Sequence, residues 1–314
     1  MLEERIAIGE LLRNPGGKSQ DEEKQEQAGS RKRASSALQE VDVPSAKVAR
    51  TSVVREIASH HVTISKQHLG SGSYGACYLG TYRNMTVVVK NLHVKELQGE
   101  NRKQAENRVR DELIYEARII NKLGDHPGLA FLFGVCSRSA PFRLIIQFHG
   151  NQKDNSSLTI STALRKRIVT DRAIWIGILG KVALALSRVH KVGFLHNDLK
   201  ANNVVLDKSE RRTYNPVIID FGKSLPMTGL QGPKNLTKER QVKYMEAFPH
   251  IAPEIVTGLR GQSVKSDIFS FGKLAERIFV KAQLGPLPEV LNGTLIVDPD
   301  KRASLEQVLE ALTV

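Results

Sequence analysis

The stretch FLHNDLKANNVVL, residues 194–206, interrupts an apolar segment with polar side chains and then becomes apolar again. Its polar residues include Asp198, Lys200 and Asn203. Burying such groups without partners costs several kcal/mol, so they are either solvated or hydrogen-bonded. A surface turn and a functional loop both meet this condition, and the rest of the sequence must decide between them.

The composition is typical of a globular protein, with 314 residues, 40% of them hydrophobic and 25% charged. Cys77 and Cys136 are too few for a disulfide scaffold, so we expect a reducing, intracellular location. We expect the cytoplasm, and the basic residues 31–33 leave nuclear import open. No apolar run approaches the roughly 18 residues of a membrane span, so we expect no membrane association.

The formal net charge of +13 raises the question of nucleic-acid binding. Residues 1–55 are nearly balanced in charge, so the excess belongs to residues 56–314. No basic stripe interleaved with aromatic residues accompanies it, and we therefore expect no nucleic-acid partner. The oligomeric state is left open.

The chain divides by composition into a tail and one domain. Residues 14–50 are polar and rich in Gly, Ser and Gln, a composition that cannot bury enough surface to offset the entropy of ordering. We expect residues 1–55 to be a disordered tail and residues 56–314 to fold. Within the fold, residues 56–150 form a strand-rich part and residues 151–314 a helical part.

The periodicity predicts an α+β fold. Residues 102–123 have the helical period, with Gly124 suited to a C-terminal cap. Another helical pattern covers residues 173–193. Short strands are predicted over residues 62–70, 76–82, 86–92, 129–135 and 143–148.

A glycine-rich segment, LGSGSYGACYLG, contains Gly70, Gly72 and Gly75 in the spacing G-x-G-x-x-G. Glycines let backbone N–H groups approach phosphate oxygens closely. Strands flank this segment on both sides, whereas a dinucleotide-binding loop leads from a strand into a helix. A plain turn is the alternative interpretation.

Three charged residues stand beside or within apolar segments, and for the first two a surface lysine and a glutamate at the edge of a helix are the alternative interpretation. Lys90 ends the apolar run VVVK, and Lys is rarely buried unless it is paired. Glu116 lies on the apolar face of the helix predicted over residues 102–123. Asp220 directly follows an apolar strand in VIIDFGKSL, where a carboxylate can hold Mg²⁺.

Further motifs follow in order: IAPE at residues 251–254, Asp267 in SDIFSFG and Arg302 in DPDKRAS. The ordered set resembles the signature of the eukaryotic protein kinases over about residues 60–312. The resemblance implies a bilobed fold, with a small antiparallel sheet and one helix in the first lobe and a larger, mainly helical second lobe. It also implies ATP, Mg²⁺ and a protein substrate.

The resemblance also implies a role for each motif residue. Asp198 would accept the proton of the substrate hydroxyl, Lys200 would lie beside the transferred phosphate, and Asn203 and Asp220 would hold Mg²⁺. A Glu254–Arg302 ion pair and a stacked His196–Phe221 pair would be structural. The residues implied in ATP binding are Leu69, Gly70, Gly72, Gly75, Cys77, Val88, Lys90, Glu116, Gln147 and His149.

Several residues depart from the family pattern. Asn197 replaces the arginine that pairs with a phosphorylated activation segment, and Ala247 replaces a threonine that contacts the catalytic Asp and Lys. Val88 replaces a smaller alanine, and the spacing from Asp267 to Arg302 is short, which predicts a reduced C-terminal region.

Lys200 favours Ser/Thr over Tyr as the phosphate acceptor. A pseudokinase, with ATP binding or scaffolding but little transfer, is the alternative of a different class. A kinase-fold enzyme that acts on a small molecule is the third.

Overall fold

The computed structural model describes residues 53–72, 75–151, 154–208, 213–228 and 236–312. Nearly all of the tail predicted over residues 1–55 therefore lies outside the described residues. The contacts of the domain begin slightly before the predicted boundary, because the carbonyl of Arg55 accepts a hydrogen bond from the N–H of Val135 at 2.9 Å. The observed class is α+β, as predicted.

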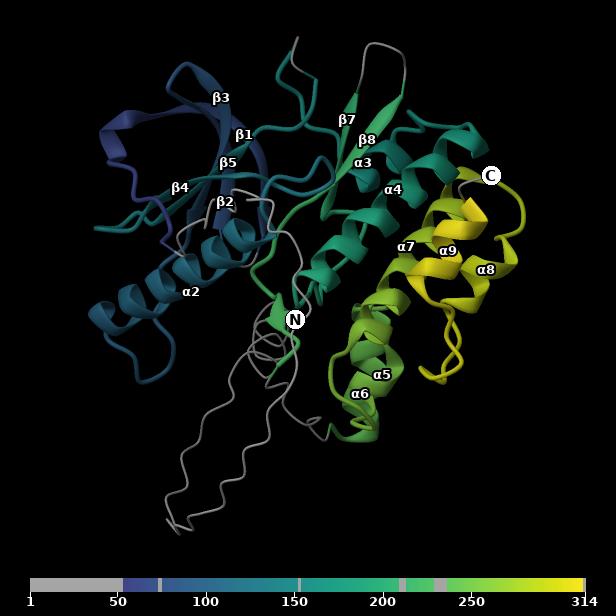
Figure 1. Cartoon of the computed structure of the whole chain (residues 1–314). Helices are drawn as coiled ribbons and strands as arrows, with labels where there is room; N and C mark the ends of the chain where they lie inside the picture. Colours follow the sequence, from purple (N-terminus) through teal and green to yellow (C-terminus); the bar gives the residue numbers. More distant parts are fainter. Residues whose placement is uncertain (1–52, 73–74, 152–153, 209–212, 229–235, 313–314) are drawn as a thin grey trace, which may run out of the picture. The chain divides into compact units, whose positions relative to one another are not determined.

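The N-terminal part is a five-stranded antiparallel sheet in the order β1-β2-β3-β5-β4 (Figure 1). Helix α2 contacts β4 and β5. The fourth strand begins at Leu132, three residues after the predicted start at Leu129. Leu129 instead forms an isolated bridge to Ile218. The strands are β1 Val62–Gly72, β2 Gly75–Tyr82, β3 Met85–Leu92, β4 Leu132–Cys136 and β5 Arg143–Gln147.

Strand β3 shows how the sheet divides its side chains between two faces. Successive side chains of a strand point to opposite faces. Val87 and Val89 are fully buried in one small apolar cluster. Val88 and Lys90 therefore point to the other face, where Val88 is paired with Ile146 of β5. The alternation places the Lys90 ammonium on the side where α2 lies.

Helix α2, Arg102–Leu123, has the predicted bounds. Asn101 and Gln104 form a capping box at its start, and the N–H of Gly124 bonds to the carbonyl of Ile120 at its end. Its buried apolar stripe includes Val109 and Leu113, and Glu116 lies within that stripe at 4% exposure. The stripe therefore carries a carboxylate toward the sheet.

The C-terminal part is mainly helical, with two small antiparallel strand pairs, β6 with β9 and β7 with β8. The pairs consist of β6 Phe194–Leu195, β9 Leu225–Pro226, β7 Val204–Lys208 and β8 Tyr214–Ile218. The helices are α3 Ile160–Arg165, α4 Arg172–Lys191, α5 Lys238–Ala247, α6 Pro253–Val256, α7 Val264–Ala282, α8 Glu289–Gly293 and α9 Leu305–Leu312, and a 3₁₀ turn, η1 Ser59–His61, precedes β1.

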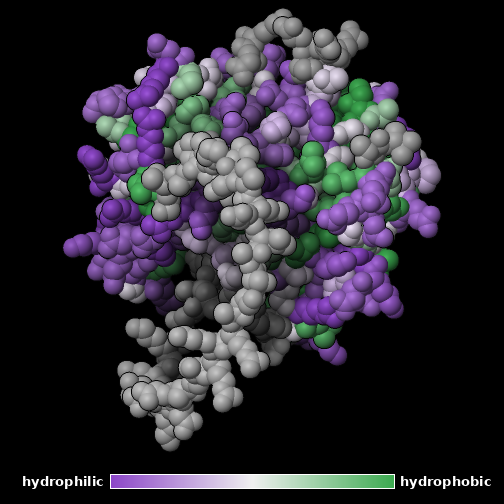
Figure 2. Space-filling model, viewed as in Figure 1, coloured by the Kyte–Doolittle hydropathy of each residue, from purple (hydrophilic) through white to green (hydrophobic). Residues whose placement is uncertain are grey.

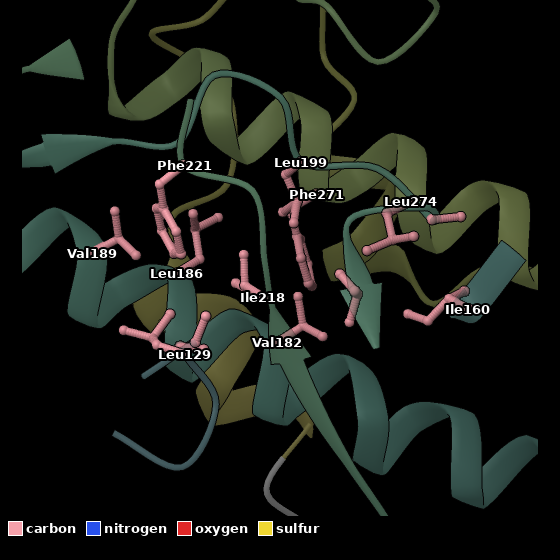
Figure 3. Close-up of a cluster of buried hydrophobic side chains, with 14 of the residues drawn as sticks. Leu129, Ile160, Val182, Leu186, Val189, Leu199, Ile218, Phe221, Phe271 and Leu274 are labelled. Carbon is pink, nitrogen blue, oxygen red and sulfur yellow. The ribbon is translucent and has the colours of Figure 1, made fainter. Parts of the chain in front are cut away.

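The apolar residues of the opening stretch lie in the main core. Leu199 points into the same cluster as Phe271 of α7 and Val182 of α4 (Figure 3). Phe221 belongs to that cluster as well, and all four side chains are fully buried. The polar residues of the stretch are therefore anchored on both sides by packed apolar residues.

The region between α7 and Arg302 is short, as predicted. Among residues 283–304, all of which the structure describes, α8 is the one helix, with five residues.

Helix α4 is long and apolar enough, by length and composition, to cross a membrane, with a mean hydropathy of 1.4 over its best window. Lys181 and Arg188 interrupt its apolar residues, so the sequence shows no continuous apolar run here. Half of that window is buried inside the domain, where Trp175 and Leu186 are inaccessible to solvent. The apolar face of α4 is thus the central packing surface of the helical part.

Hydrophilic residues predominate on the molecular face shown in Figure 2.

Candidate active site

Lys90 joins the sheet, α2 and the segment after β8. Its ammonium lies 2.9 and 3.0 Å from the two carboxylate oxygens of Glu116 and 2.8 Å from Oδ1 of Asp220. Burial by itself lowers the pKa of Lys90, but the two carboxylates outweigh it and hold that pKa above its ordinary value. Lys90 therefore stays charged while it is 13% exposed.

Asp220 remains accessible at this junction, because its side chain is 39% exposed. Removal from water by itself raises the pKa of Asp220, but the Lys90 ammonium outweighs this effect and lowers it. Its φ of 66° is in the left-handed region, which Asp tolerates better than most residues. The carboxylate is ionised and accessible, as a Mg²⁺ ligand must be.

Asp198 is surrounded by donors. Oδ2 accepts from Lys200 Nζ at 2.8 Å and from Asn203 Nδ2 at 3.2 Å. Oδ1 lies 3.0 Å from His250 Nε2 and 3.2 Å from Lys223 Nζ. Burial by itself raises the pKa of Asp198, but these groups hold it well below its usual range. Asp198 is thus an ionised carboxylate with only 3% exposure.

The backbone of this loop is held by Asp267 of α7. The two carboxylate oxygens of Asp267 accept the N–H groups of His196 and Asn197 at 2.7 and 2.8 Å. The His196 ring packs edge-on against Phe221 with a centroid distance of 5.1 Å, which confirms the predicted pair. The loop that carries Asp198 is thereby connected to the segment that carries Asp220.

The structure resolves the question raised by FLHNDLKANNVVL. Asp198 and Asn203 are buried and hydrogen-bonded, and His196 is inaccessible to solvent. Asn202 is exposed. The stretch is therefore a hydrogen-bonded loop in contact with other charged groups and not a solvated turn.

The three glycines differ in what their surroundings allow. A Cβ on Gly75 would overlap the backbone carbonyl oxygen of Asn91, so β2 and β3 need glycine there. Among the described residues, a Cβ on Gly70 or Gly72 would meet nothing within 4 Å. Gly72 pairs with Gly75 across the β1–β2 turn, whose tip, residues 73–74, lies outside the described residues. Open space beside Gly70 and Gly72 is compatible with a phosphate group.

Several of the residues implied in ATP binding lie on neighbouring strands. Cys77 is paired with Lys90, and Val88 with Ile146, so these side chains share one face of the sheet. Leu69 lies near the end of β1 and is half-buried, and the exposed Gln147 ends β5.

His149 has a side-chain contact with β7. Its Nδ1 lies 3.3 Å from Oδ2 of Asp207, a residue of β7 that also accepts the N–H of Gly150. The buried Nε2 of His149 has no partner among the described residues. The side chain therefore joins this segment to β7, a contact that the sequence analysis did not predict.

The oxygen and nitrogen groups present fit ATP and Mg²⁺. Mg²⁺ prefers carboxylate and amide oxygens, which Asp220 and Asn203 supply, and a phosphate needs a nearby cation, which Lys90 supplies. Asp198 and Lys90 have different hydrogen-bond partners, Lys200 for Asp198 and Glu116 for Lys90.

Two residues at Asp198 escaped the sequence analysis. Lys223 follows the DFG triplet, and His250 precedes IAPE by one residue. Neither belongs to a periodic pattern, and their contact with Asp198 depends on the tertiary packing of the two segments that carry them, one just before β9 and one just before α6. The predicted Glu254–Arg302 ion pair, in contrast, is confirmed at 2.9 and 3.1 Å.

The environment of Cys77 yields a chemical prediction. Burial raises the pKa of its thiol to about 11, and the Lys90 ammonium offsets only part of this effect. The thiolate is the nucleophile, so near neutral pH iodoacetamide is expected to alkylate Cys77 at least about tenfold more slowly than an unperturbed thiol of pKa about 8.5. Mass spectrometry over time measures the rate, with the urea-unfolded chain as the control. Equal rates in the folded and unfolded chains would contradict the prediction.

The fold and the site together are those of a phosphotransferase-type domain. A five-stranded sheet carries Lys90, which is paired with Glu116, and two loops carry the carboxylates of Asp198 and Asp220. Residues 63–286 match the family described as protein kinase domain. This protein belongs to the protein kinase domain family.

Curated relatives agree with this assignment. Cysteine-rich receptor-like protein kinase 44 of Arabidopsis thaliana is 31% identical over 67% of this chain and 51% of that protein. Cysteine-rich receptor-like protein kinase 19 of the same plant is 32% identical over 67% of this chain and 30% of that protein. The tyrosine-protein kinase transforming protein Abl of Abelson murine leukemia virus is 28% identical over 67% of this chain and 25% of that protein. The chain spans about half or less of the length of these relatives.

Proposed function

We propose that the domain transfers the γ-phosphate of ATP to a serine or threonine hydroxyl of a protein substrate. The observation that carries the proposal is the buried, ionised Asp198 beside Lys200 and Asn203, with the Lys90–Asp220 pair formed in the same structure. Mg²⁺, when bound, would neutralise charge on the phosphates, with Asn203 and Asp220 as its protein ligands.

Asp198 orients the substrate hydroxyl in this mechanism. Its pKa is held well below its usual range, so it is a weak base before transfer begins. A weak base gains a proton only as the hydroxyl oxygen bonds to phosphorus and becomes acidic, which agrees with a late proton transfer. Lys200, bound to Oδ2 of Asp198, places a cation beside the acceptor. Catalysis then depends mainly on position and charge.

The choice of Ser/Thr over Tyr rests on Lys200. The Abl relative is named as a tyrosine kinase, whereas the names of the receptor-like kinases state no acceptor, so these names do not favour serine or threonine. Incubation of the full chain with Mg·ATP labelled at the γ-phosphate and a mixed Ser/Thr and Tyr peptide library measures the preference. We expect phosphoserine or phosphothreonine, and Asp220→Ala should abolish the signal. Phosphotyrosine as the main product would overturn the Ser/Thr assignment, and no transfer would overturn the kinase proposal.

A second candidate function is that of a pseudokinase. It is favoured by the protein donors that already occupy the lone pairs of the Asp198 carboxylate. Both carboxylate oxygens already accept protein donors, and Ala247 provides no hydroxyl to the substrate platform. The same experiment separates the two functions, because a pseudokinase would retain ATP binding, measured by calorimetry, and give no labelled peptide.

Asn197 predicts independence from activation-segment phosphorylation. Its Nδ2 donates to the backbone carbonyl of Lys223 at 3.2 Å, so a neutral amide holds this segment where an arginine would require a phosphate. Tyr244 is 6% exposed, which hinders its modification, and Thr237 caps α5. Phosphatase treatment is expected to change peptide phosphorylation by less than about twofold. Loss of activity after treatment, with a catalytically dead phosphatase as the control, would contradict this expectation.

A further inference from the structure

His250 contacts Asp198 from a different segment than the loop that carries Asp198. Its Nε2 lies 3.0 Å from Oδ1, within ordinary hydrogen-bond distance. Two lysine ammonium groups also lie 2.8 and 3.2 Å from the Asp198 carboxylate, so its oxygens accept, and the imidazole is the donor with its proton on Nε2. The contact therefore requires that His250 carries a proton on Nε2.

The His250 ring is held in place by its surroundings. Its side chain is 12% exposed. Its backbone carbonyl accepts the hydroxyl of Ser270 on α7 at 2.6 Å. The Phe248 ring lies edge-on to the imidazole with a centroid distance of 6.4 Å. Helix α7 also supplies Asp267, which holds the backbone of the Asp198 loop. Helix α7 thus holds the backbone of both the Asp198 loop and His250.

The two lysine donors to Asp198 are less restricted than His250. Lys223 reaches Oδ1 at 3.2 Å with a side chain that is 32% exposed, and Lys200 reaches Oδ2 with a side chain that is 33% exposed. A lysine ammonium sits on a flexible stem, whereas an imidazole has only two side-chain torsions. His250 is thus the less mobile of the two groups on Oδ1.

The position of the His250 ring matters because protein donors already occupy the lone pairs of the Asp198 carboxylate. A substrate hydroxyl must displace one donor from Asp198, and Lys223 is the more exposed of the two on Oδ1. If His250 stays in place during this exchange, Oδ1 keeps its orientation while the hydroxyl takes the site that Lys223 leaves. A misplacement of about 1 Å at a reacting group can lower a rate about 10²-fold.

We propose that His250 is a positioning residue, which fixes Oδ1 of Asp198 toward the substrate hydroxyl through a hydrogen bond from Nε2. Ala247, three residues earlier, has no polar side-chain atom that could do this. The inference rests on the proposed kinase activity, and it concerns Asp198 and the substrate hydroxyl and not ATP or Mg²⁺.

Two replacements of His250 separate hydrogen bonding from packing. Gln places an amide N–H near the position of Nε2, so His250→Gln is expected to keep kcat within about threefold of the wild type. His250→Leu fills similar space without a donor and is expected to lower kcat about 10- to 100-fold, with the KM for ATP within about twofold. His126, half-buried after α2, accepts a backbone N–H and provides the matched control, His126→Leu, with unchanged kcat.

Thermal unfolding of each variant shows whether a lower kcat reflects lost structure. If His250→Leu lowered kcat by less than threefold, or if His250→Gln fell as far as His250→Leu in a folded chain, the inference would be overturned.

A measurement without substrate keeps this test apart from the kinase proposal. Nitrogen-15 NMR of the imidazole in the full chain is expected to show His250 protonated on Nε2, with a shift of that resonance in Asp198→Asn. A proton on Nδ1 alone would overturn the inference, since a bare Nε2 cannot donate. If the wild type transferred no phosphate but showed the Nε2 proton, the kinase proposal would fail and the His250–Asp198 contact would stand.

Discussion

Asp198→Asn is expected to lower kcat for peptide phosphorylation by about 10²- to 10⁴-fold. The amide keeps the size of the carboxylate but removes its charge and one acceptor oxygen, so it can neither orient the hydroxyl as an ion nor accept its proton. Asp198 does not contact Lys90 in the structure, so the KM for ATP should change by less than about threefold. Steady-state kinetics with peptide and ATP varied separately measure both quantities.

The same substitution has an electrostatic consequence. Lys200, Lys223 and His250 all lie within 3.2 Å of the Asp198 carboxylate, and removing its charge leaves these groups close together without the anion between them. Burial already lowers the pKa of His250, and the Asp198 carboxylate acts in the opposite direction, so the pKa of His250 should fall further in the variant. A titration followed by NMR measures the change.

The control for this prediction is Asp125→Asn, an exposed aspartate on the loop after α2. This substitution removes one negative charge from the surface, and kcat and the KM for ATP should stay unchanged. If Asp198→Asn retained more than about a tenth of the wild-type kcat, Asp198 could not be the proton acceptor.

The elements with strong local signals could be predicted from the sequence. Helix α2 has its predicted bounds because its apolar period, its glycine cap and its flanking polar residues agree. The Lys90–Glu116 pair follows from the resemblance to the protein kinases, because the two positions alone also suit a surface lysine and a glutamate at the edge of a helix. In contrast, nothing local shows that Leu129 pairs with Ile218 in place of extending β4.

The missed contacts of the site have a common physical cause. His250 and Asp198 are 52 residues apart, and His149 and Asp207 are 58 residues apart. Such contacts depend on how α7 and β7 position distant loops, which periodicity does not encode. The left-handed φ of 61° at Asn197 is likewise set by tertiary contacts, here the Asp267 carboxylate on its N–H.

Arg302→Met is expected to lower the free energy of unfolding by about 3–5 kcal/mol. The Arg302 side chain is inaccessible to solvent, and its guanidinium donates to both carboxylate oxygens of Glu254 at 2.9 and 3.1 Å. The substitution leaves the Glu254 carboxylate buried without this cation, and the desolvation of that charge is no longer compensated. Urea unfolding followed by circular dichroism measures the loss.

The matched control is the exposed pair Arg260–Asp300, whose closest contact is 2.6 Å. Asp300→Asn should leave the urea midpoint unchanged within error, because water and side-chain entropy cancel most of the gain from an exposed ion pair. Similar losses for Arg302→Met and Asp300→Asn would show that burial does not set the strength of these pairs, which would contradict the prediction.

The double variant Glu254→Met, Arg302→Met separates the charge from the remaining contacts of Arg302. Removing both charges eliminates the uncompensated carboxylate, so the double variant should be more stable than Arg302→Met alone. Arg302 also donates to the carbonyls of Ile296 and Val297 at 2.9 and 3.2 Å, and methionine cannot replace those bonds. The double variant should therefore remain less stable than the wild type. A double variant no more stable than Arg302→Met would mean that the carbonyl contacts, and not the ion pair, dominate at this position.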